Sequence, residues 1–405
     1  MKKYIIAIIF VTLIIFQACT PLYTPLYSIC SQNPKEIYWI TMYQWTLPEN
    51  VGFSGKIRAV HNSFYIYFYA KESIMETNVK RFWINTWGFI QNKLGVKMIR
   101  DIQPQFNVVK MNNGYLTYAH PYIYIYSDKN KEVCNRYLKF KKFLDSRNIP
   151  LLFVQMPHKI HQDKRFLPRG VTDCNNEKAD IFLDFLKNTN CSFYDSRTIF
   201  KNDYQSHYKL FYLGDHHWKP EYSFLAFKNI MQKVNSDFGI EFDKNVIDES
   251  LYYKKEFPFP IELQSQAKRA GKYYSQYDKS QVYLIPKFPV NVTVSVPQTK
   301  QQYQGGFESV FMPDHENRPL KKSINHNVSQ GRLLLIKDSF SLPMFDYYAM
   351  AFHEVDMIDL RGFNQSVMEY IDKTPPDVVI IAYIPGYFLP GMFRFDNPNI
   401  DTSIQ

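Results

Sequence analysis

The chain has 405 residues, of which 45% are hydrophobic and 21% are charged, a composition typical of globular proteins. Its length allows one large domain with additions, or two domains. The formal net charge is +10, but the lysines and arginines are dispersed and do not alternate with aromatic residues, as they do in a nucleic-acid groove. We therefore expect no nucleic-acid partner. Glycine is scarce and no glycine-rich phosphate loop is present, so we expect no nucleotide cofactor.

The first residues have the pattern of a bacterial export signal. Lys2 and Lys3 precede an apolar run over 4–16, and a small residue, Ala18, comes before Cys19. Because Ala18 and Cys19 resemble a lipobox, Cys19 is a candidate for lipidation; an uncleaved membrane anchor is the alternative. Residues 1–19 are thus predicted to be a signal peptide or anchor. The rest of the chain is expected outside the cytoplasm, in the periplasm or at the cell surface.

The cysteine count agrees with an oxidising compartment. If Cys19 carries lipid, four cysteines remain, an even number that suits disulfides, although the sequence does not choose their pairing. No C-x-x-C pair is present, which argues against a zinc or thioredoxin-like site. The four are Cys30, Cys134, Cys174 and Cys191.

The chain divides by composition into an N-terminal region and an α/β region. Prolines interrupt residues 20–35, which we interpret as a tether. Residues 36–125 are rich in aromatic strands and are predicted to pack on the core. Residues 126–405 alternate strands and helices, and form the predicted catalytic domain. Within it, the polar segment 240–330 breaks the alternation and is interpreted as an insertion bordering the site, with a strand pair around 282–296.

Continuous apolar runs in the second region predict strands that are buried on both faces. Alternation of such strands with helices predicts a mostly parallel sheet with helices on both faces, and a site at the carboxyl ends of the strands. The predicted strands are 150–155, 191–195, 332–336, 354–358 and 377–382, and the predicted helices are 134–147, 177–188, 220–237 and 364–372.

The first chemical motif is Gly214-Asp215-His216-His217-Trp218. In an extended segment Asp215 and His217 leave on one side and His216 points away. A carboxylate beside an imidazole fixes its tautomer and stabilises the imidazolium, and Trp218 can shield the pair. Metal binding by Asp215, His216 and His217 is the alternative. The other histidines lack metal-ligand spacing, so we expect no metal.

The second motif is Lys337-Asp338-Ser339-Phe340, directly after an apolar strand. A serine is inert at its free pKa and needs a base, and His217 is the best-motivated one. Taken alone, an Asp-Ser pair after a strand is usually a helix cap. The two motifs together predict Asp215, His217 and Ser339 as a catalytic triad.

Together the motifs resemble the DHHW protein family. The resemblance rests on the DHHW signature at 214–218, the nucleophile block at 337–340, Tyr-Gln-Gly-Gly at 303–306 and Met-Ile-Asp-Leu-Arg at 357–361. It covers most of 110–390. That family is similar to the SGNH-hydrolase-like O-acetyltransferases of alginate and other exopolysaccharides. The resemblance implies a three-layer α/β/α fold of the SGNH-hydrolase type with a mostly parallel sheet.

The resemblance also implies roles for individual residues. Asp215 is the orienting acid, His217 the base and Ser339 the nucleophile. In ordinary SGNH enzymes a glycine precedes the Asp-Ser pair, and Lys337 replaces it here. The conserved oxyanion donors of those enzymes are not identified, and the amide of Ser339 is the safest donor. Further candidates are Gly305, Gly306 and Asn325 for the oxyanion, and Arg361 for an acidic substrate group, with a structural ion pair as the alternative for Arg361.

The activity implied is transfer of an acetyl group to a cell-surface or exported polysaccharide through an acetyl-serine, without metal or other cofactor. The expected partners are a glycan acceptor, a multi-pass membrane O-acyltransferase that supplies acetyl groups, and the membrane through the N-terminus. Two alternatives remain. One is a carbohydrate esterase with the same triad, and the other is a non-catalytic glycan-binding surface protein.

Overall fold

The structure is a computed structural model that describes residues 102–103, 108–118, 128–167, 173, 175–199, 204–258, 278–311, 318–396 and 399. The predicted leader, the tether, most of the aromatic-rich region and Cys19 lie outside these residues. In the described part of the chain, no helix has the length and apolar character that crossing a membrane requires.

The chain forms two compact units. The first consists of Met1–Asn113, Tyr118–Tyr126 and Phe166–Cys174, and in it β1 (Ile102–Gln103) pairs antiparallel with β2 (Val108–Lys110). The second unit, which contains both sequence motifs, consists of Gly114–Thr117, Ser127–Arg165 and Asn175–Gln405.

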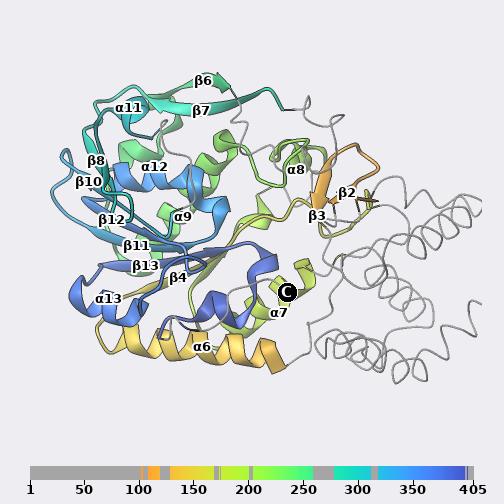
Figure 1. Ribbon diagram of the computed structural model, residues 1–405, viewed down its shortest axis with the longest axis horizontal. Coiled ribbons are helices and arrows are strands. Elements are labelled where there is room, and N and C mark those ends of the chain that lie inside the picture. Colours follow the sequence, from red (N-terminus) through yellow and green to blue (C-terminus); the bar gives the residue numbers. More distant parts are fainter. Residues whose placement is uncertain are drawn as a thin grey trace, which may run out of the picture. The chain divides into compact units, whose positions relative to one another are not determined.

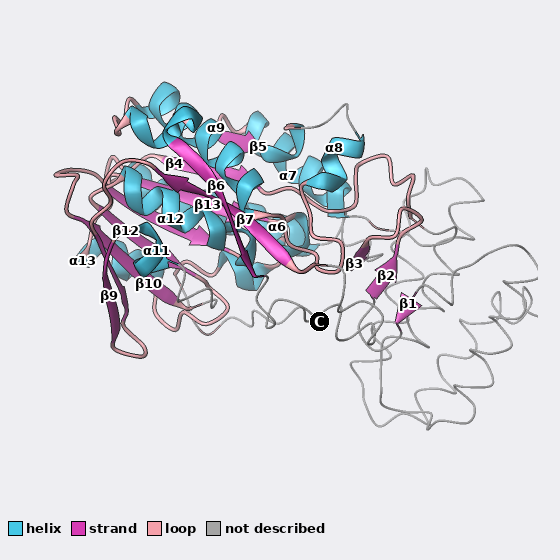
Figure 2. Cartoon of the chain, turned by 90° about the horizontal axis from the view of Figure 1, so that it is seen from above, coloured by secondary structure: helices cyan, strands magenta, loops and turns pink. Residues whose placement is uncertain are grey.

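An eight-stranded sheet forms the centre of the second unit. Its strands are β4 (Leu151–Gln155), β5 (Phe193–Asp195), β8 (Val292–Val296), β9 (Gln301–Gly305), β10 (Leu320–Asn325), β11 (Arg332–Lys337), β12 (Glu354–Ile358) and β13 (Val378–Tyr383). The order is β5-β4-β13-β11-β12-β10-β8-β9, so β4 and β5 lie at one side and β9 and β10 at the other (Figure 2). The strands from β5 to β12 pair in parallel, and the remaining pairs are antiparallel. The predicted mostly parallel sheet is confirmed.

Helices cover both faces of this sheet (Figure 1). On one face lie α6 (Asp128–Asp145), α7 (Asn175–Asn188) and α13 (Val367–Lys373), and on the other α9 (Pro220–Phe238) and α12 (Leu342–Ala351). Side chains alternate along a strand. Leu334 and Ile336 of β11 therefore pack in the core on the α6 side, while Leu333 and Leu335 pack in the core on the α9 side. The result is the expected three-layer α/β/α fold. The shorter elements are β3 (Leu116–Tyr118), α8 (Tyr204–Lys209), α11 (Phe307–Phe311), η3 (Ser196–Thr198), η4 (Lys244–Ile247), η5 (Glu249–Leu251), η7 (Ser339–Ser341), η8 (Pro385–Tyr387) and η9 (Pro390–Phe393).

The ends of α9 follow from the local sequence. Pro220 occupies the first helical position, where its missing N–H is not needed. Gly239 ends the helix with φ 67°, a left-handed conformation that costs glycine little, and its N–H donates to the carbonyl of Asn235. Both predicted ends of this helix are confirmed, and the segment with His217 directly precedes its start.

The segment 240–330 contributes more to the core than an added loop does. β6 (Tyr252–Pro258) and β7 (Ser280–Pro286) form an antiparallel pair, while β8, β9 and β10 extend the central sheet. The predicted strands near 282 and 296 exist as β7 and β8, but their predicted pairing is wrong. The apolar residues of β7 instead pack in the core that contains α9, and β8 pairs with β9 and β10.

Two of the cysteines expected to form disulfides, Cys134 and Cys191, are free thiols in the described part of the chain. Both lie in or against the core on the α6 side of the sheet. Burial raises the pKa of the Cys134 thiol to about 11, so it is a packing residue and a poor nucleophile. Cys30 and Cys174 lie outside the described residues.

Candidate active site

Ser339 lies at the carboxyl end of β11, the strand between β12 and β13. The preceding Asp338 is fully buried, and its two carboxylate oxygens accept from the backbone N–H of Phe340 at 2.8 Å and of Ile384 at 2.6 Å. The first bond caps η7 and the second ties the turn to the end of β13. The helix-cap interpretation is therefore correct for Asp338, and the cap holds Ser339 at the carboxyl end of β11.

Charged groups beneath the serine are buried together. Burial raises the pKa of Asp338 to about 6, while hydrogen bonds from the Ile384 and Phe340 amides and the nearby Arg361 and Lys337 oppose this rise. Lys337, which stands where ordinary SGNH enzymes have glycine, is fully buried with its Nζ 3.3 Å from Asp359 Oδ2. Burial lowers the pKa of Lys337 to about 8.

The segment with the DHHW signature is a tight loop between α8 and α9. Phe211 and Trp218 form an antiparallel bridge across its base, and the Tyr212 N–H donates to the His217 carbonyl at 3.2 Å. We expected the site at the carboxyl ends of the strands, but this motif does not directly follow a strand of the central sheet. The motif instead lies in an irregular loop that directly precedes α9.

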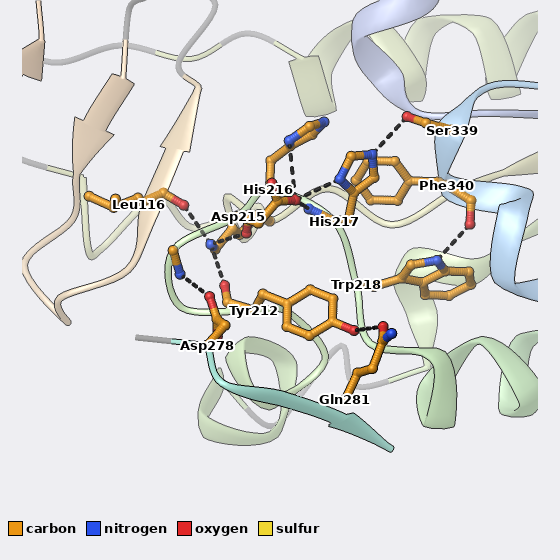
Figure 3. A network of polar contacts seen from close by, with 12 residues as sticks. Leu116, Tyr212, Asp215, His216, His217, Trp218, Asp278, Gln281, Ser339 and Phe340 are labelled. Atoms are coloured by element: carbon orange, nitrogen blue, oxygen red, sulfur yellow. Dashed lines mark hydrogen bonds and ion pairs between the residues drawn. The ribbon is translucent and has the colours of Figure 1, made fainter. Parts of the chain in front are cut away.

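Asp215, His217 and Ser339 form a continuous hydrogen-bonded chain (Figure 3). Asp215 Oδ1 lies 2.6 Å from His217 Nδ1, and His217 Nε2 lies 2.8 Å from Ser339 Oγ, across 122 positions of sequence. The same carboxylate oxygen accepts from the His217 backbone N–H at 2.8 Å. With Nδ1 protonated toward Asp215, Nε2 is free to accept the serine proton.

The three residues of this hydrogen-bonded chain differ in burial. Asp215 is 1% exposed, whereas His217 and Ser339 are partly exposed. Burial alone raises the pKa of Asp215, but His217, His216 and the hydrogen bonds from His217 outweigh it and lower the pKa to about 2. The carboxylate is therefore ionised at any pH near neutrality and stabilises an imidazolium at His217.

His216 was expected to point away from Asp215 and His217, but its side chain lies close to both. Its ring centroid lies 3.9 Å from that of His217, and its Nδ1 lies 3.6 Å from Asp215 Oδ1. The expectation failed because the segment bends sharply and is not an extended strand. Among the described residues, Asp215, His216 and His217 are also the group that offers three possible metal-ligand atoms within 4.8 Å of one another. Both ring nitrogens of His217 already have partners, so a metal at this position competes with the serine arrangement.

Trp218 links the two motifs. Its ring is buried, as the predicted shielding role requires, and its Nε1–H donates to the carbonyl of Phe340 at 2.7 Å. The Phe340 ring in turn lies 5.1 Å from the His217 ring. The residues next to the base and next to the nucleophile are therefore in direct contact.

The other oxyanion candidates lie far from Ser339, at the end of the sheet where β11 and β12 begin. Asn325 pairs in register with Val292, which pairs with Gly305, and this row aligns with the amino-terminal ends of β11 and β12. Ser339 is at the opposite, carboxyl end of β11. Asn325 donates to the Met350 carbonyl at 2.9 Å and accepts from the Asn327 N–H at 2.9 Å, which is a structural role.

Gly305 and Gly306 form the turn between β9 and α11. Gly305 has φ +146°, and a Cβ at this position would lie 2.6 Å from Ser309 Oγ, so the turn requires glycine. The remaining candidate for an oxyanion donor is the N–H of Ser339, which begins η7 and lacks an intrahelical partner by helix geometry.

Arg361 lies just past the carboxyl end of β12 and forms an ion pair. Its guanidinium donates through Nε and Nη2 to the two carboxylate oxygens of Asp359, at 2.9 and 2.6 Å, and through Nη1 to the Tyr387 hydroxyl at 2.7 Å. Of the two interpretations left open, the contacts present are those of a structural ion pair.

Two residues around the loop were missed by sequence reasoning. Lys159, just beyond β4, is 1% exposed and donates to loop carbonyls, and Asp278 accepts from the N–H groups of Leu213 and Gly214. Their partners are backbone atoms far away in sequence. The one available signal was a lysine four residues after a fully buried strand.

Comparison with known proteins supports the fold. No family model and no curated protein sequence matches the chain. Among solved structures, Bacillus cereus PatB1 is 18% identical with a TM-score of 0.59, covering 71% of this chain and 99% of its own. The structure of the same protein with a sulfonyl adduct is 18% identical with a TM-score of 0.60, and the match covers 72% of this chain and 98% of that one. A DHHW family protein from Eubacterium siraeum is 13% identical with a TM-score of 0.54, covering 72% and 95%. The expected likeness to the DHHW family is confirmed at the level of the fold.

Proposed function

We propose that the chain is a serine-dependent O-acetyltransferase that modifies a cell-surface or exported polysaccharide. The observation that carries this proposal is the hydrogen-bonded chain from Asp215 through His217 to Ser339. A buried, ionised carboxylate orients an imidazole whose second nitrogen contacts a serine hydroxyl, which is the arrangement that activates serine for acyl transfer. The resemblance of the two motifs to acetyltransferase blocks supports the choice of acyl group.

In the first half-reaction, His217 Nε2 takes the proton of Ser339 as Oγ attacks the acyl carbonyl of the donor ester. The N–H of Ser339 donates to the oxyanion of the tetrahedral intermediate. The carbon–oxygen bond to the leaving group then breaks, and the proton on His217 passes to the leaving oxygen. An acetyl-serine remains.

In the second half-reaction, an acceptor hydroxyl gives its proton to His217 and attacks the acetyl-serine. Collapse of the intermediate releases Ser339 Oγ, which regains the proton from His217. With a sugar hydroxyl as acceptor the reaction is transfer, and with water it is hydrolysis. The triad serves either acceptor, so acceptor competition is the measurement that separates transferase from esterase.

The proposal places the protein in the bacterial cell envelope. The export pattern at 1–19 supports this location, and Cys19 is the proposed site of a lipid anchor. A multi-pass membrane O-acyltransferase is the proposed source of acetyl groups, because acetyl donors are made in the cytoplasm and the proposed site lies outside it. The acceptor is proposed to be a glycan hydroxyl.

The test uses the purified full-length protein with p-nitrophenyl acetate and, separately, with an aryl sulfonyl fluoride, read by nitrophenol release and by intact mass. We expect turnover and one sulfonyl adduct, both lost in S339A, with turnover also lost in H217A. S341A is the matched control, because Ser341 lies two residues away, is fully buried, and has an Oγ without a hydrogen-bond partner among the described residues.

Two results would overturn the serine mechanism. The first is a folded protein that gives neither turnover nor adduct, which would favour a non-catalytic glycan-binding protein. The second is activity that survives S339A but is abolished by a chelator, which would favour a metal at Asp215, His216 and His217. If the triad is active, added oligosaccharides decide between acetylated glycan and free acetate as the product.

A further inference from the structure

The loop that carries Asp215 and His217 directs several of its carbonyl groups toward one buried point. The Nζ of Lys159 occupies that point and donates to the carbonyl oxygens of Tyr212 at 2.6 Å, of Asp215 at 2.7 Å and of Leu213 at 3.3 Å. A further bond at 2.5 Å reaches the carbonyl of Leu116. The Leu116 N–H also donates to the Leu213 carbonyl at 2.8 Å, so the two segments are joined around the lysine.

This arrangement is unusual for a buried lysine. Lys159 is 1% exposed, and in the described part of the chain its hydrogen bonds go to main-chain oxygens, not to a carboxylate. Buried charges in proteins are normally paired with an opposite charge. Four converging carbonyl oxygens repel one another unless a cation or a set of donors lies between them, and an ammonium supplies three N–H groups.

A carboxylate holds the same loop through its amides. Asp278 accepts from the N–H of Leu213 at 2.8 Å and of Gly214 at 2.6 Å. The loop thus has carbonyl groups bound by a cation and adjacent N–H groups bound by an anion. In the conformation that satisfies both, the Asp215 carboxylate lies against His217.

We infer that Lys159 is a positioning residue for the triad, a built-in cation that shapes the loop bearing Asp215 and His217. The inference rests on the proposed function for its catalytic consequence, but its structural part stands on the contacts alone. Burial lowers the pKa of Lys159 to about 7, while the nearby Asp215 and Asp278 carboxylates oppose that change. The contacts to carbonyl oxygens provide a further stabilisation of the ammonium.

The first test replaces the ammonium by a methyl-thioether of similar length. K159M should remain folded by circular dichroism and lose about 10²-fold or more in kcat/KM toward p-nitrophenyl acetate, because a shift of about 1 Å at a catalytic group costs this much. K164M is the control, since Lys164 pairs with Glu177 outside the loop. K159M with kcat/KM within about threefold of the unmodified protein would overturn the inference.

The second test uses chemical rescue, which separates the role of the ammonium from that of the apolar part of the lysine side chain. In K159A the emptied cradle should accept methylammonium, and kcat/KM should rise at least about tenfold as methylammonium is added. Tetramethylammonium, which has no N–H, should give no rescue. Folded K159A that gains nothing from methylammonium would count against the cation cradle. If K159A does not fold alone, recovery of folded protein when methylammonium is present during refolding replaces the rate measurement.

A third measurement separates this inference from the proposed function. The His217 Nδ1–H that faces Asp215 should give a far-downfield proton NMR signal, whether or not the protein turns over any ester. We expect the signal in the unmodified protein and in S339A, and its loss in K159M. An unmodified protein without esterase activity but with this dependence on Lys159 would remove the proposed function and retain the inference. Persistence of the signal in K159M would overturn the inference.

Discussion

The indole Nε1–H of Trp218 donates to the backbone carbonyl oxygen of Phe340 across 2.7 Å. Trp218 directly follows His217 and Phe340 directly follows Ser339, so this bond joins the two motifs one residue beyond the base and the nucleophile. Both partners are buried, which protects the bond from competition with water. The distance between His217 and Ser339 is therefore set partly by a contact in which neither takes part.

Replacing Trp218 by phenylalanine tests this link, because phenylalanine retains an aromatic ring but has no N–H. W218F should lower the free energy of unfolding by about 1–3 kcal/mol, since the buried Phe340 carbonyl loses its donor. It should also lower kcat/KM by between about tenfold and 10²-fold through displacement of His217. Urea unfolding and ester hydrolysis measure the two effects.

The control for this change is Y348F. Tyr348 is a fully buried aromatic residue on α12 whose hydroxyl has no hydrogen-bond partner among the described residues. Removing that hydroxyl should leave both the stability and the activity close to those of the unmodified protein. A W218F protein that matches Y348F in both measurements would show that the Trp218–Phe340 bond does not position the base.

The low pKa of Asp215 predicts how stability depends on pH. Its pKa in the folded state is about 2, below the value of 3.8 expected for an unperturbed aspartate. Its contribution to stability is therefore fully present above about pH 4 and is lost as the pH falls toward 2. The shift corresponds to about 2 kcal/mol. Urea unfolding of the unmodified protein and of D215N between pH 2 and pH 7 measures this, and their difference should shrink at the acid end. A difference that stays constant over the range would contradict the assignment.

Replacing Arg361 by lysine distinguishes a structural ion pair from a substrate-binding arginine. Lysine cannot form the two-pronged contact with Asp359, so R361K should lower the free energy of unfolding by about 1–3 kcal/mol and leave KM unchanged. R147K is the control, because the Arg147–Asp372 pair is largely exposed and exposed pairs contribute about 0–1 kcal/mol. A raised KM without loss of stability would instead assign Arg361 to the substrate.

The position of Asn325 predicts a loss of stability without a loss of activity. N325A removes the amide that bonds to Met350 and Asn327 at the amino-terminal edge of the sheet, at a cost of about 1–3 kcal/mol. Because Ser339 lies at the other edge, kcat/KM at a temperature where the protein is folded should not change. A large loss of kcat/KM in folded N325A would return this residue to the list of oxyanion donors.

Much of the fold was predictable because the strands carry their burial in their own sequence. The run 354–358 was predicted with the bounds that β12 has, and 332–336 differs from β11 by one residue. These strands are covered on both faces, so most of their side chains are apolar. The pairing of strands, in contrast, was not predictable from the sequence of each strand. The partner of β7 is β6, separated from it by more than twenty residues, and no local pattern identifies such a partner.

The candidate site shows the same division. Asp215, His217 and Ser339 were proposed from residue type and motif, and the structure brings their side chains together. The direction of His216 was mistaken because it depends on the bend of the backbone. Gly305, Gly306 and Asn325 were misplaced because an oxyanion donor is defined by its distance from the serine, which the sequence does not contain. Lys159 and Asp278 were missed because they act on main-chain atoms of a distant loop.

The nucleophile and the base belong to parts of the molecule with different local stability. Ser339 follows β11, which is hydrogen-bonded on both sides within the sheet, whereas His217 sits on an irregular loop held mainly by the side chains of Lys159, Asp278 and Trp218. Local opening of such a loop requires less free energy than opening of a central strand. Under mild denaturant the base should separate from the serine while the sheet keeps its slow amide exchange. We therefore expect an inactive state that is almost fully folded, in which activity is lost through opening of the loop before the domain unfolds.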